Sequence, residues 1–197
     1  MNDLNFNSNL INIGGDPNDP FYRYKMESLK TQIVGKGNGI QTILLNIEQV
    51  ASMIGHPLEI ITKYLSYCTG SIWNSSKNSL TGNQDLTTLQ EYISQYITSF
   101  VLCGGCGNPE TSYHIEGKKK RAELFVKCAS CGYYPVVKLE GEKCSNETIK
   151  FIKGKSNDKL MNFIINYIQK NPMEQSTEKK QYDKESNVLG DINDNIF

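Results

Sequence analysis

Two Cys-x-x-Cys pairs constrain this chain more than any other feature of its sequence. The pattern is Cys103-x2-Cys106-x21-Cys128-x2-Cys131. Each pair places two thiolates on one tight turn, so four sulfurs can close a tetrahedron around a single Zn²⁺ ion. Four cysteine ligands leave no open coordination position. The expected cofactor is therefore one structural zinc ion rather than a catalytic metal.

A zinc ribbon over residues 99–138 is expected to carry these cysteines. Residues 112–115 and 123–127 have the composition of strands, and a basic loop from Gly117 to Arg121 joins them. Glycines near the cysteines allow the positive φ angles and close backbone approach that such turns need; they are at positions 104, 105, 107 and 132. The alternative is redox-active dithiols or plain buried thiols, but a redox Cys-x-x-Cys usually stands alone at a helix start.

The remaining cysteines and both histidines are not expected to bind metal. Cys68 and Cys144 have no partner at ligand spacing, so we interpret them as ordinary buried or incidental thiols. His56 directly precedes a proline that starts a predicted helix, and His114 lies in the middle of a predicted strand. The predicted site therefore consists of four sulfurs alone.

Residues 21–98 are predicted to form a small mixed α/β domain. Strands are expected at 31–34 and 40–45, joined by a mobile glycine-rich loop at 35–39. Residues typical of helix starts and ends follow, and the cysteine pairs come after them. The predicted fold class is therefore α+β, a small mixed α/β domain followed by a four-cysteine zinc ribbon, with disordered tails.

Three helices are predicted within this domain. They begin at Asn46, Pro57 and Asp85, and a short β-hairpin is expected over residues 66–84. Asn46 with Gln49 three residues later has the capping-box pattern. Each predicted helix repeats its apolar residues every three or four positions, which indicates one buried face.

The ends of the chain have a different composition. Residues 1–20 are rich in Asn, Asp and Gly and are expected to form a flexible arm. Residues 139–172 are expected to hold a polar, irregular insertion and then a closing helix with apolar positions between 160 and 168. Residues 173–197 are predicted to be a disordered acidic tail.

The formal net charge of zero conceals an uneven distribution. Residues 21–170 contain eighteen basic and twelve acidic residues, whereas both ends are acidic. A basic body is compatible with nucleic-acid contact, and solvated surface lysines explain it equally well. The N-terminus does not resemble a secretory signal, and the longest apolar run is too short to cross a bilayer. We expect a soluble, cytoplasmic chain with no membrane partner.

The segment FYRYKM, residues 21–26, places three aromatic residues around Arg23. It can be an edge segment that docks its aromatics on the domain while the guanidinium stays solvated. It can also present the arginine to a nucleotide bound by another protein, where a guanidinium neutralises charge that develops during phosphoryl transfer. Composition alone favours the first interpretation.

Four blocks of sequence, FYRYKM, GKGNGI, FVLCGGCGNPET and CASCGY, resemble in order and spacing the N-terminal domain of eukaryotic translation initiation factor 5. That domain belongs to a family shared with the beta subunit of initiation factor 2. The resemblance covers residues 17–137, and residues 138–158 look like an insertion. It implies a GTPase-activating protein, not itself an enzyme, that acts during start-codon selection.

The resemblance also implies the partners and the residues that meet them. The target is GTP on the gamma subunit of initiation factor 2, which also has a beta subunit, in the ternary complex with initiator methionyl-tRNA on the small ribosomal subunit. The essential arginine of the family matches Arg23, which would act in trans. Its neighbours Tyr22, Tyr24 and Lys25 would contact the partner, and a further supporting lysine matches Lys63.

A glycine-rich loop of the family approaches the initiator tRNA anticodon and the mRNA start codon. It matches Lys36, Gly37 and Asn38. Small residues allow close backbone approach, and one lysine and one amide can reach phosphates and base edges. Gln41 stands where the family usually has lysine. The family also carries a C-terminal helical-repeat domain, and residues 171–197 cannot be that domain.

Two other functions remain open at this point. A non-catalytic binding module like the beta subunit would contact the gamma subunit and tRNA without activating hydrolysis, but that subunit lacks FYRYKM. An unrelated transcription-type zinc ribbon would explain the cysteines and none of the preceding hundred residues. The chain has no Gly-x-x-x-x-Gly-Lys-Ser/Thr loop, so it is not expected to hold GTP by itself.

Overall fold

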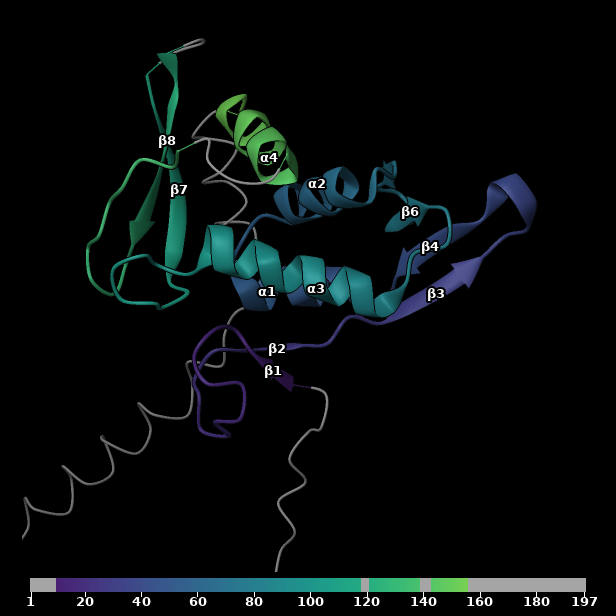
Figure 1. Cartoon of the computed structure of the whole chain (residues 1–197), viewed down its shortest axis with the longest axis horizontal. Coiled ribbons are helices and arrows are strands. Elements are labelled where there is room, and N and C mark those ends of the chain that lie inside the picture. Colours follow the sequence, from purple (N-terminus) through teal and green to yellow (C-terminus); the bar gives the residue numbers. More distant parts are fainter. Residues whose placement is uncertain (1–9, 118–120, 139–142, 156–197) are drawn as a thin grey trace, which may run out of the picture. The chain divides into compact units, whose positions relative to one another are not determined.

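The computed structural model describes residues 10–117, 121–138 and 143–155 (Figure 1). The expected closing helix between residues 160 and 168 and the expected acidic tail lie outside the described residues. In the described part, helices and antiparallel strands are mixed, and the four cysteines cluster in a hairpin near its C-terminal end. The predicted α+β fold class is confirmed.

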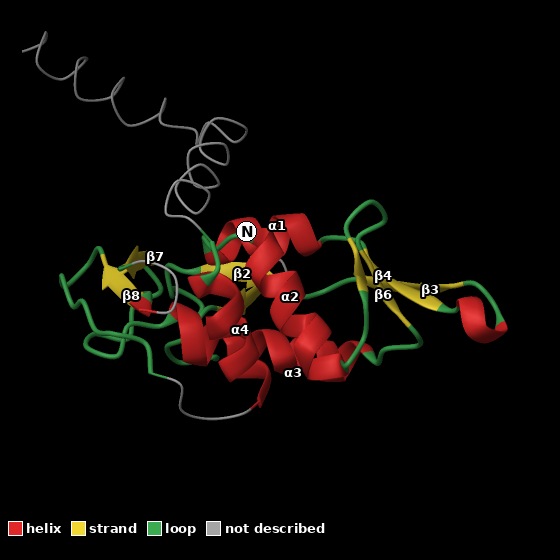
Figure 2. Ribbon diagram, turned by 90° about the horizontal axis from the view of Figure 1, so that it is seen from above, coloured by secondary structure: helices red, strands yellow, loops and turns green. Residues whose placement is uncertain are grey.

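A four-stranded antiparallel sheet forms the first part of the domain. Its strand order is β3 (Thr31–Val34), β4 (Gln41–Leu44), β6 (Ser79–Thr81) and β5 (Trp73–Asn74). The strands predicted on both sides of the glycine-rich loop are therefore confirmed. From above, these strands and the hairpin of residues 111–128, here called the cysteine hairpin, lie on opposite sides of the helices (Figure 2).

The three predicted helices are present as α1 (Ile47–Ile54), α2 (Leu58–Thr69) and α3 (Leu86–Tyr96). A π-helical turn over Ile97–Val101 extends α3 toward the first cysteine. The hairpin expected from residue 66 begins later, because α2 continues for another turn. One apolar face of each helix is buried, including Val50, Ile54, Ile61, Leu65, Leu89 and Ile93.

The side chain of Asn46 does not form the expected capping box. It makes no hydrogen bond to the first turn of α1. Its Oδ1 instead accepts from the Lys30 backbone N–H at 2.8 Å, and its Nδ2 donates to the Ser28 carbonyl at 2.8 Å. The residue is 6% exposed, so these bonds satisfy a buried amide. Asn46 therefore fastens the connection that precedes β3.

The N-terminal segment is part of the fold from residue 10 onward, contrary to the expected flexible arm. Strand β1 (Leu10–Asn12) pairs antiparallel with β2 (Lys25–Glu27), and Ile13 is 1% exposed. The Asn-rich and Gly-rich composition concealed the apolar residues Leu10, Ile11 and Ile13. Burial of Ile13 in the core and of Ile11 against it supplies free energy that orders the segment.

The second part of the domain is a hairpin of β7 (Thr111–Glu116) and β8 (Glu123–Cys128), close to the predicted strands. Helix α4 (Lys143–Lys153) packs against α2 and β8. The sequence had assigned this stretch to an irregular polar insertion, and that assignment was wrong. Four buried residues spaced by helical turns, Cys144, Thr148, Ile149 and Ile152, form its inner face.

One hydrophobic core joins the helices to the hairpin. It contains residues from β2, all four α-helices and the ribbon strands, including Tyr113 and Leu124. Among the described residues, none of the helices has the length and apolar character needed to span a bilayer.

A buried chain of polar side chains crosses the same boundary. His56 Nδ1 lies 3.1 Å from the Tyr96 hydroxyl, and His56 Nε2 lies 3.2 Å from Thr111 Oγ1. The Tyr113 hydroxyl lies 3.0 Å from the Tyr96 hydroxyl, and Thr111 Oγ1 donates to the Val101 carbonyl at 2.7 Å. Because Thr111 uses its proton on Val101, it accepts from His56, which is consistent with a neutral imidazole protonated at Nε2. This chain links the end of α1, α3 with its π-helical turn, and strand β7.

Burial of His56 predicts a loss of stability in weak acid. Desolvation lowers the pKa of this imidazole from 6.5 to about 4. The unfolded chain therefore binds one more proton than the folded chain between these pH values. The contribution of neutral His56 to the free energy of unfolding is complete above pH 6.5 and is lost as the pH falls toward 4. The loss is on the order of 3 kcal/mol. Denaturant unfolding measured from pH 7 to pH 4 should show it.

The matched control is His56→Gln, which keeps a side-chain N–H donor but does not titrate. Acid also protonates the cysteines in both proteins, so the difference between their pH profiles isolates His56. Parallel profiles for the two proteins would contradict the assignment.

Candidate functional site

The structure brings the four predicted cysteine sulfurs together. Cys103 and Cys131 Sγ are 3.6 Å apart, Cys106 and Cys128 Sγ are 3.7 Å apart, and all four sulfurs lie within 4.8 Å of one another. Cys103 and Cys128 are buried, and Cys106 and Cys131 are exposed at the outer side. This cluster can hold one metal ion.

The two cysteine turns have the same backbone geometry. Gly107 N–H donates to the Cys103 carbonyl at 2.8 Å, and Gly132 N–H donates to the Cys128 carbonyl at 3.1 Å. Their φ angles are +74° and +75°, which only glycine adopts without strain. The glycine after each pair therefore allows both thiols of that pair to face the same point.

The thiols cannot all ionise without a compensating cation. Burial raises the pKa of the Cys103 thiol, but the backbone N–H groups of Cys106 and Gly105 outweigh it and lower the value to about 7. A backbone N–H from Tyr133 lowers the pKa of the Cys131 thiol, but the neighbouring thiols and burial raise it to about 12. A bound cation removes this conflict, since it stabilises every thiolate that coordinates it.

The segment that carries Arg23 lies in a folded loop between β1 and β2. Asn12 Nδ2 donates to the carbonyls of Asp16 at 2.7 Å and Asp19 at 2.9 Å, which closes the loop from within. Tyr22 donates to the Ile13 carbonyl at 3.0 Å. The Tyr22 ring also occupies the space beside Gly15, where an added Cβ would lie 2.5 Å from it.

Arg23 is exposed between two tyrosines that the fold holds in place. The Tyr22 and Tyr24 rings meet edge to face with centroids 5.8 Å apart, and the Arg23 guanidinium carbon lies 5.5 Å from the Tyr24 ring centroid. Lys25 donates from Nζ to the Pro20 carbonyl. Phe21 is 88% exposed, so only two of the three aromatics dock on the protein.

Tyr24 connects the arginine segment to the cysteine hairpin. Its hydroxyl donates to Glu110 Oε1, and the second carboxylate oxygen of Glu110 accepts from Ser130 Oγ at 2.6 Å. Ser130 lies between two of the cysteines. Hydrogen bonds from Ser130 and Tyr24 lower the pKa of Glu110, and the nearby charge of Arg23 also lowers it. The residue after the predicted arginine is therefore linked through Glu110 to the turn that carries Cys128 and Cys131.

Lys63 is remote in sequence and contacts a different element. Its Nζ lies 5.0 Å from the Tyr67 ring centroid and 5.7 Å from that of Phe151, on α4. Lys155 Nζ lies 4.5 Å from the Phe151 ring centroid, and it forms an ion pair with Glu59 Oε1 at 2.5 Å. These aromatic faces hold two lysines at one place between α2 and the end of α4.

Lys36, Gly37 and Asn38 form the exposed tip between β3 and β4, where a single 3₁₀ turn spans Gly37–Gly39. Gly35 has φ +88°, and an added Cβ would lie 2.3 Å from the Gly39 carbonyl oxygen. The expected loop is thus a tight hairpin end. It lies across the helices from the cysteine hairpin (Figure 1).

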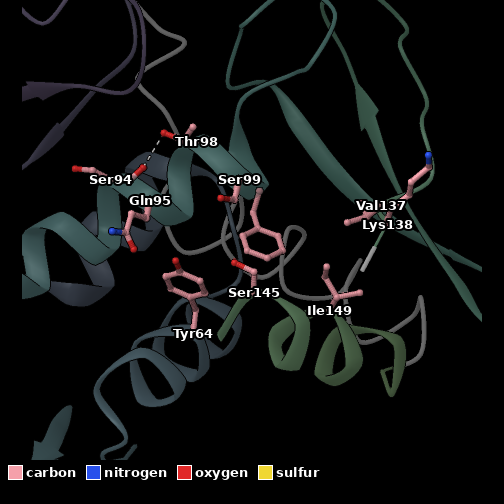
Figure 3. A pocket seen from close by; sticks show the side chains of 10 residues that line it. Tyr64, Ser94, Gln95, Thr98, Ser99, Val137, Lys138, Ser145 and Ile149 are labelled. Atoms are coloured by element: carbon pink, nitrogen blue, oxygen red, sulfur yellow. Dashed lines mark hydrogen bonds between the residues drawn. The ribbon is translucent and has the colours of Figure 1, made fainter. Parts of the chain in front are cut away.

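A cavity of about 490 Å³ opens between α2, the end of α3 and α4 (Figure 3). Tyr64, Phe100 and Ile149 supply its apolar wall. Its polar lining consists of hydroxyl and amide side chains and one lysine: Ser94, Gln95, Thr98, Ser99, Ser145 and Lys138. None of the residues predicted from the sequence as a site lines this cavity.

Two residues of the site were not predicted. Glu110 follows the first cysteine pair, in the block CGNPET, and nothing in its spacing indicates that it meets Tyr24. Phe151 was missed together with α4. A helical pattern from Cys144 to Ile152 was the available signal.

An α/β body that shares its core with a four-cysteine ribbon is the class of protein that this fold and site define. Residues 15–134 match the family described as a domain found in initiation factors 2B and 5. The chain belongs to this family.

Named relatives agree with this assignment. The chain is 36% identical over 148 residues to probable eukaryotic translation initiation factor 5 of Schizosaccharomyces pombe, which covers 71% of this chain and 37% of the relative. It is 38% identical over 124 residues to eukaryotic translation initiation factor 5 of Dictyostelium discoideum, covering 62% and 30%. For probable eukaryotic translation initiation factor 5-2 of Arabidopsis thaliana the values are 35% over 176 residues, 87% and 35%.

These relatives are named as translation initiation factors. The chain spans about a third of the length of the curated relatives that it matches.

The cysteine cluster predicts one metal ion per chain. Elemental analysis after purification without chelators should find one equivalent. Cys106→Ser should reduce that content several-fold, because the three remaining thiolates cannot close the tetrahedron. Cys68→Ser is the matched control and should keep its metal. Equal metal content in the two variants would refute the four-sulfur site.

Proposed function

We propose that this chain is a GTPase-activating module that supplies Arg23 in trans to the GTP-bound gamma subunit of initiation factor 2. The observation that carries the proposal is the geometry of Arg23. Its guanidinium is exposed, whereas the tyrosines on both sides are fastened to the protein by hydrogen bonds. A rigid frame around an exposed cation suits insertion into another protein's site.

The chemistry of arginine fits this role better than that of lysine. A planar guanidinium can donate two parallel hydrogen bonds to phosphate oxygens and remains charged at any physiological pH. Charge that spreads over the oxygens of the transferring phosphoryl group would be stabilised by it. The chain would contribute this charge and no nucleotide site of its own. The similarity to proteins named eukaryotic translation initiation factor 5 supports a role in initiation.

Other surfaces of the chain fit the same assembly. Tyr22, Tyr24 and Lys25 would border the contact with initiation factor 2, which includes its gamma and beta subunits. Lys63 would support it from α2.

The tip at Lys36, Gly37 and Asn38 is exposed, and it combines a small residue with one positive charge and one amide, which suits contact with initiator methionyl-tRNA and the mRNA start codon on the small ribosomal subunit. This proposal places the chain in the cytoplasm.

We also propose that the metal is a structural zinc ion. A tetrahedron with Zn–S bonds of about 2.3 Å has sulfur–sulfur distances of about 3.8 Å. The 3.6 Å and 3.7 Å separations between the facing thiols are close to this value. Zinc would hold Cys103, Cys106, Cys128 and Cys131 as thiolates and has no redox chemistry. Its part would be to fix the two cysteine turns.

Arg23→Ala is predicted to lower stimulated GTP hydrolysis by up to about a thousandfold, because the charge offered to the phosphoryl group is lost. Arg23→Lys should recover only a small part, since an ammonium group cannot make the same paired bonds. The measurement is single-turnover hydrolysis by initiation factor 2 complexes on small ribosomal subunits.

Arg121→Ala is the matched control, because Arg121 is the other arginine of the chain and is also exposed. It should stimulate GTP hydrolysis at the wild-type rate. Wild-type rates for Arg23→Ala would exclude Arg23 as the activating group. Failure of the wild-type chain itself to stimulate hydrolysis would leave a non-catalytic binding module.

A further inference from the structure

We propose that Glu110 is a positioning residue that holds the Arg23 segment against the cysteine hairpin through Tyr24. The role in hydrolysis rests on the proposed function, whereas the mechanical link can be tested without it. Glu110 belongs to the ribbon, and Tyr24 is 86 residues earlier in the chain.

Both carboxylate oxygens of Glu110 are engaged. Oε1 accepts from the Tyr24 hydroxyl, and Oε2 accepts from Ser130 Oγ at 2.6 Å. Bonds to an ionised acceptor are roughly twice as strong as those between neutral groups. The lowered pKa of Glu110, caused first by Ser130 and then by Tyr24, indicates that the acceptor is charged at neutral pH. A single carboxylate therefore bridges two segments.

The backbone at Glu110 is fixed by the cysteine turns as well. Its carbonyl accepts from the Ala129 N–H at 2.8 Å, inside the second turn, and the Asn108 carbonyl accepts from the Cys103 N–H at 3.0 Å, beside the first. Glu110 thus lies where the two turns meet. The two turns therefore fix the backbone from which its carboxylate extends.

The link leaves the charge of Arg23 available. Within the described residues, no carboxylate oxygen lies within salt-bridge distance of its guanidinium. The guanidinium lies beside the Tyr24 ring, and Glu110 binds the hydroxyl of the same side chain. Glu110 consequently orients Arg23 through the tyrosine and does not neutralise it by direct pairing.

Trypsin can report the link directly, because it cleaves after Arg23 and Lys25. We expect Glu110→Ala and Tyr24→Phe to speed cleavage at these two bonds about fivefold to tenfold, as expected for loss of one hydrogen bond in a locally opening segment. The double variant should be no faster than the quicker single variant, because both changes remove the same bond. Mass spectrometry of the folded chain, with metal content verified, measures these rates.

Glu116→Ala is the matched control. Glu116 accepts from the Tyr134 hydroxyl at 2.9 Å on the same hairpin, away from the Arg23 segment. It removes an equivalent tyrosine–glutamate bond and should leave cleavage after Arg23 unchanged. Equal cleavage rates in Glu110→Ala and Glu116→Ala would overturn the link.

Stimulated GTP hydrolysis tests the positioning role. Glu110→Ala and Tyr24→Phe should each lower the maximal rate about tenfold, with the half-saturating concentration of the chain within about twofold of wild type, because misplacement affects the reacting geometry. Glu110→Gln should recover part of the rate, since its Oε1 still accepts from Tyr24. Glu116→Ala should match wild type.

The two proposals fail in different ways. Faster cleavage with an unchanged maximal rate in Glu110→Ala, while Arg23→Ala is inactive, overturns positioning and leaves the proposed function intact. If Arg23→Ala stimulates GTP hydrolysis at the wild-type rate, the proposed function is overturned. The catalytic part of this inference is then overturned with it. The cleavage rates then still decide whether Glu110 holds the segment.

Discussion

Four cysteine sulfurs within 4.8 Å of one another determine much of the structure around them. Thiolates at these distances repel unless a cation lies among them, so a bound metal ion and the two turns would depend on each other. Once the turns are fixed, Glu110 stands between them and reaches Tyr24. The cysteine cluster is thereby linked by hydrogen bonds through Glu110 to a segment near the N-terminus. The chemistry proposed for Arg23 depends on this frame.

The sequence predicted the features that repeat at short range. Cysteine spacing indicated the cluster, and apolar periodicity indicated α1 to α3 and the strands on both sides of Gly35. It failed where a long-range contact decides the structure. Leu10–Asn12 lies in a stretch with the composition of a disordered arm and becomes a strand only because β2 is available to pair with it. Helix α4 was missed because polar residues outnumber its four buried positions.

The site itself was predictable only in part. The resemblance to known family members selected Arg23, and the structure adds what surrounds it. Pairwise contacts such as Tyr24 with Glu110 join residues 86 positions apart, and no local rule relates them. Lys36 to Asn38 and Lys63 lie on other elements, so the predicted residues form several separate surfaces rather than one cleft. Such a distribution suits a protein that meets a large assembly at several points.

The π-helical turn over Ile97–Val101 determines how the cysteine hairpin is rotated about the axis of α3. Its wide turn, closed by Leu102 N–H on the Ile97 carbonyl at 3.0 Å, turns the Val101 carbonyl toward Thr111. Each residue of a helix advances the chain by about 100°. Deletion of one residue here would rotate the cysteine hairpin about the axis of α3, and this rotation would separate Glu110 from Tyr24. The length of this segment therefore constrains the site in addition to its buried side chains, Ile97, Phe100 and Val101.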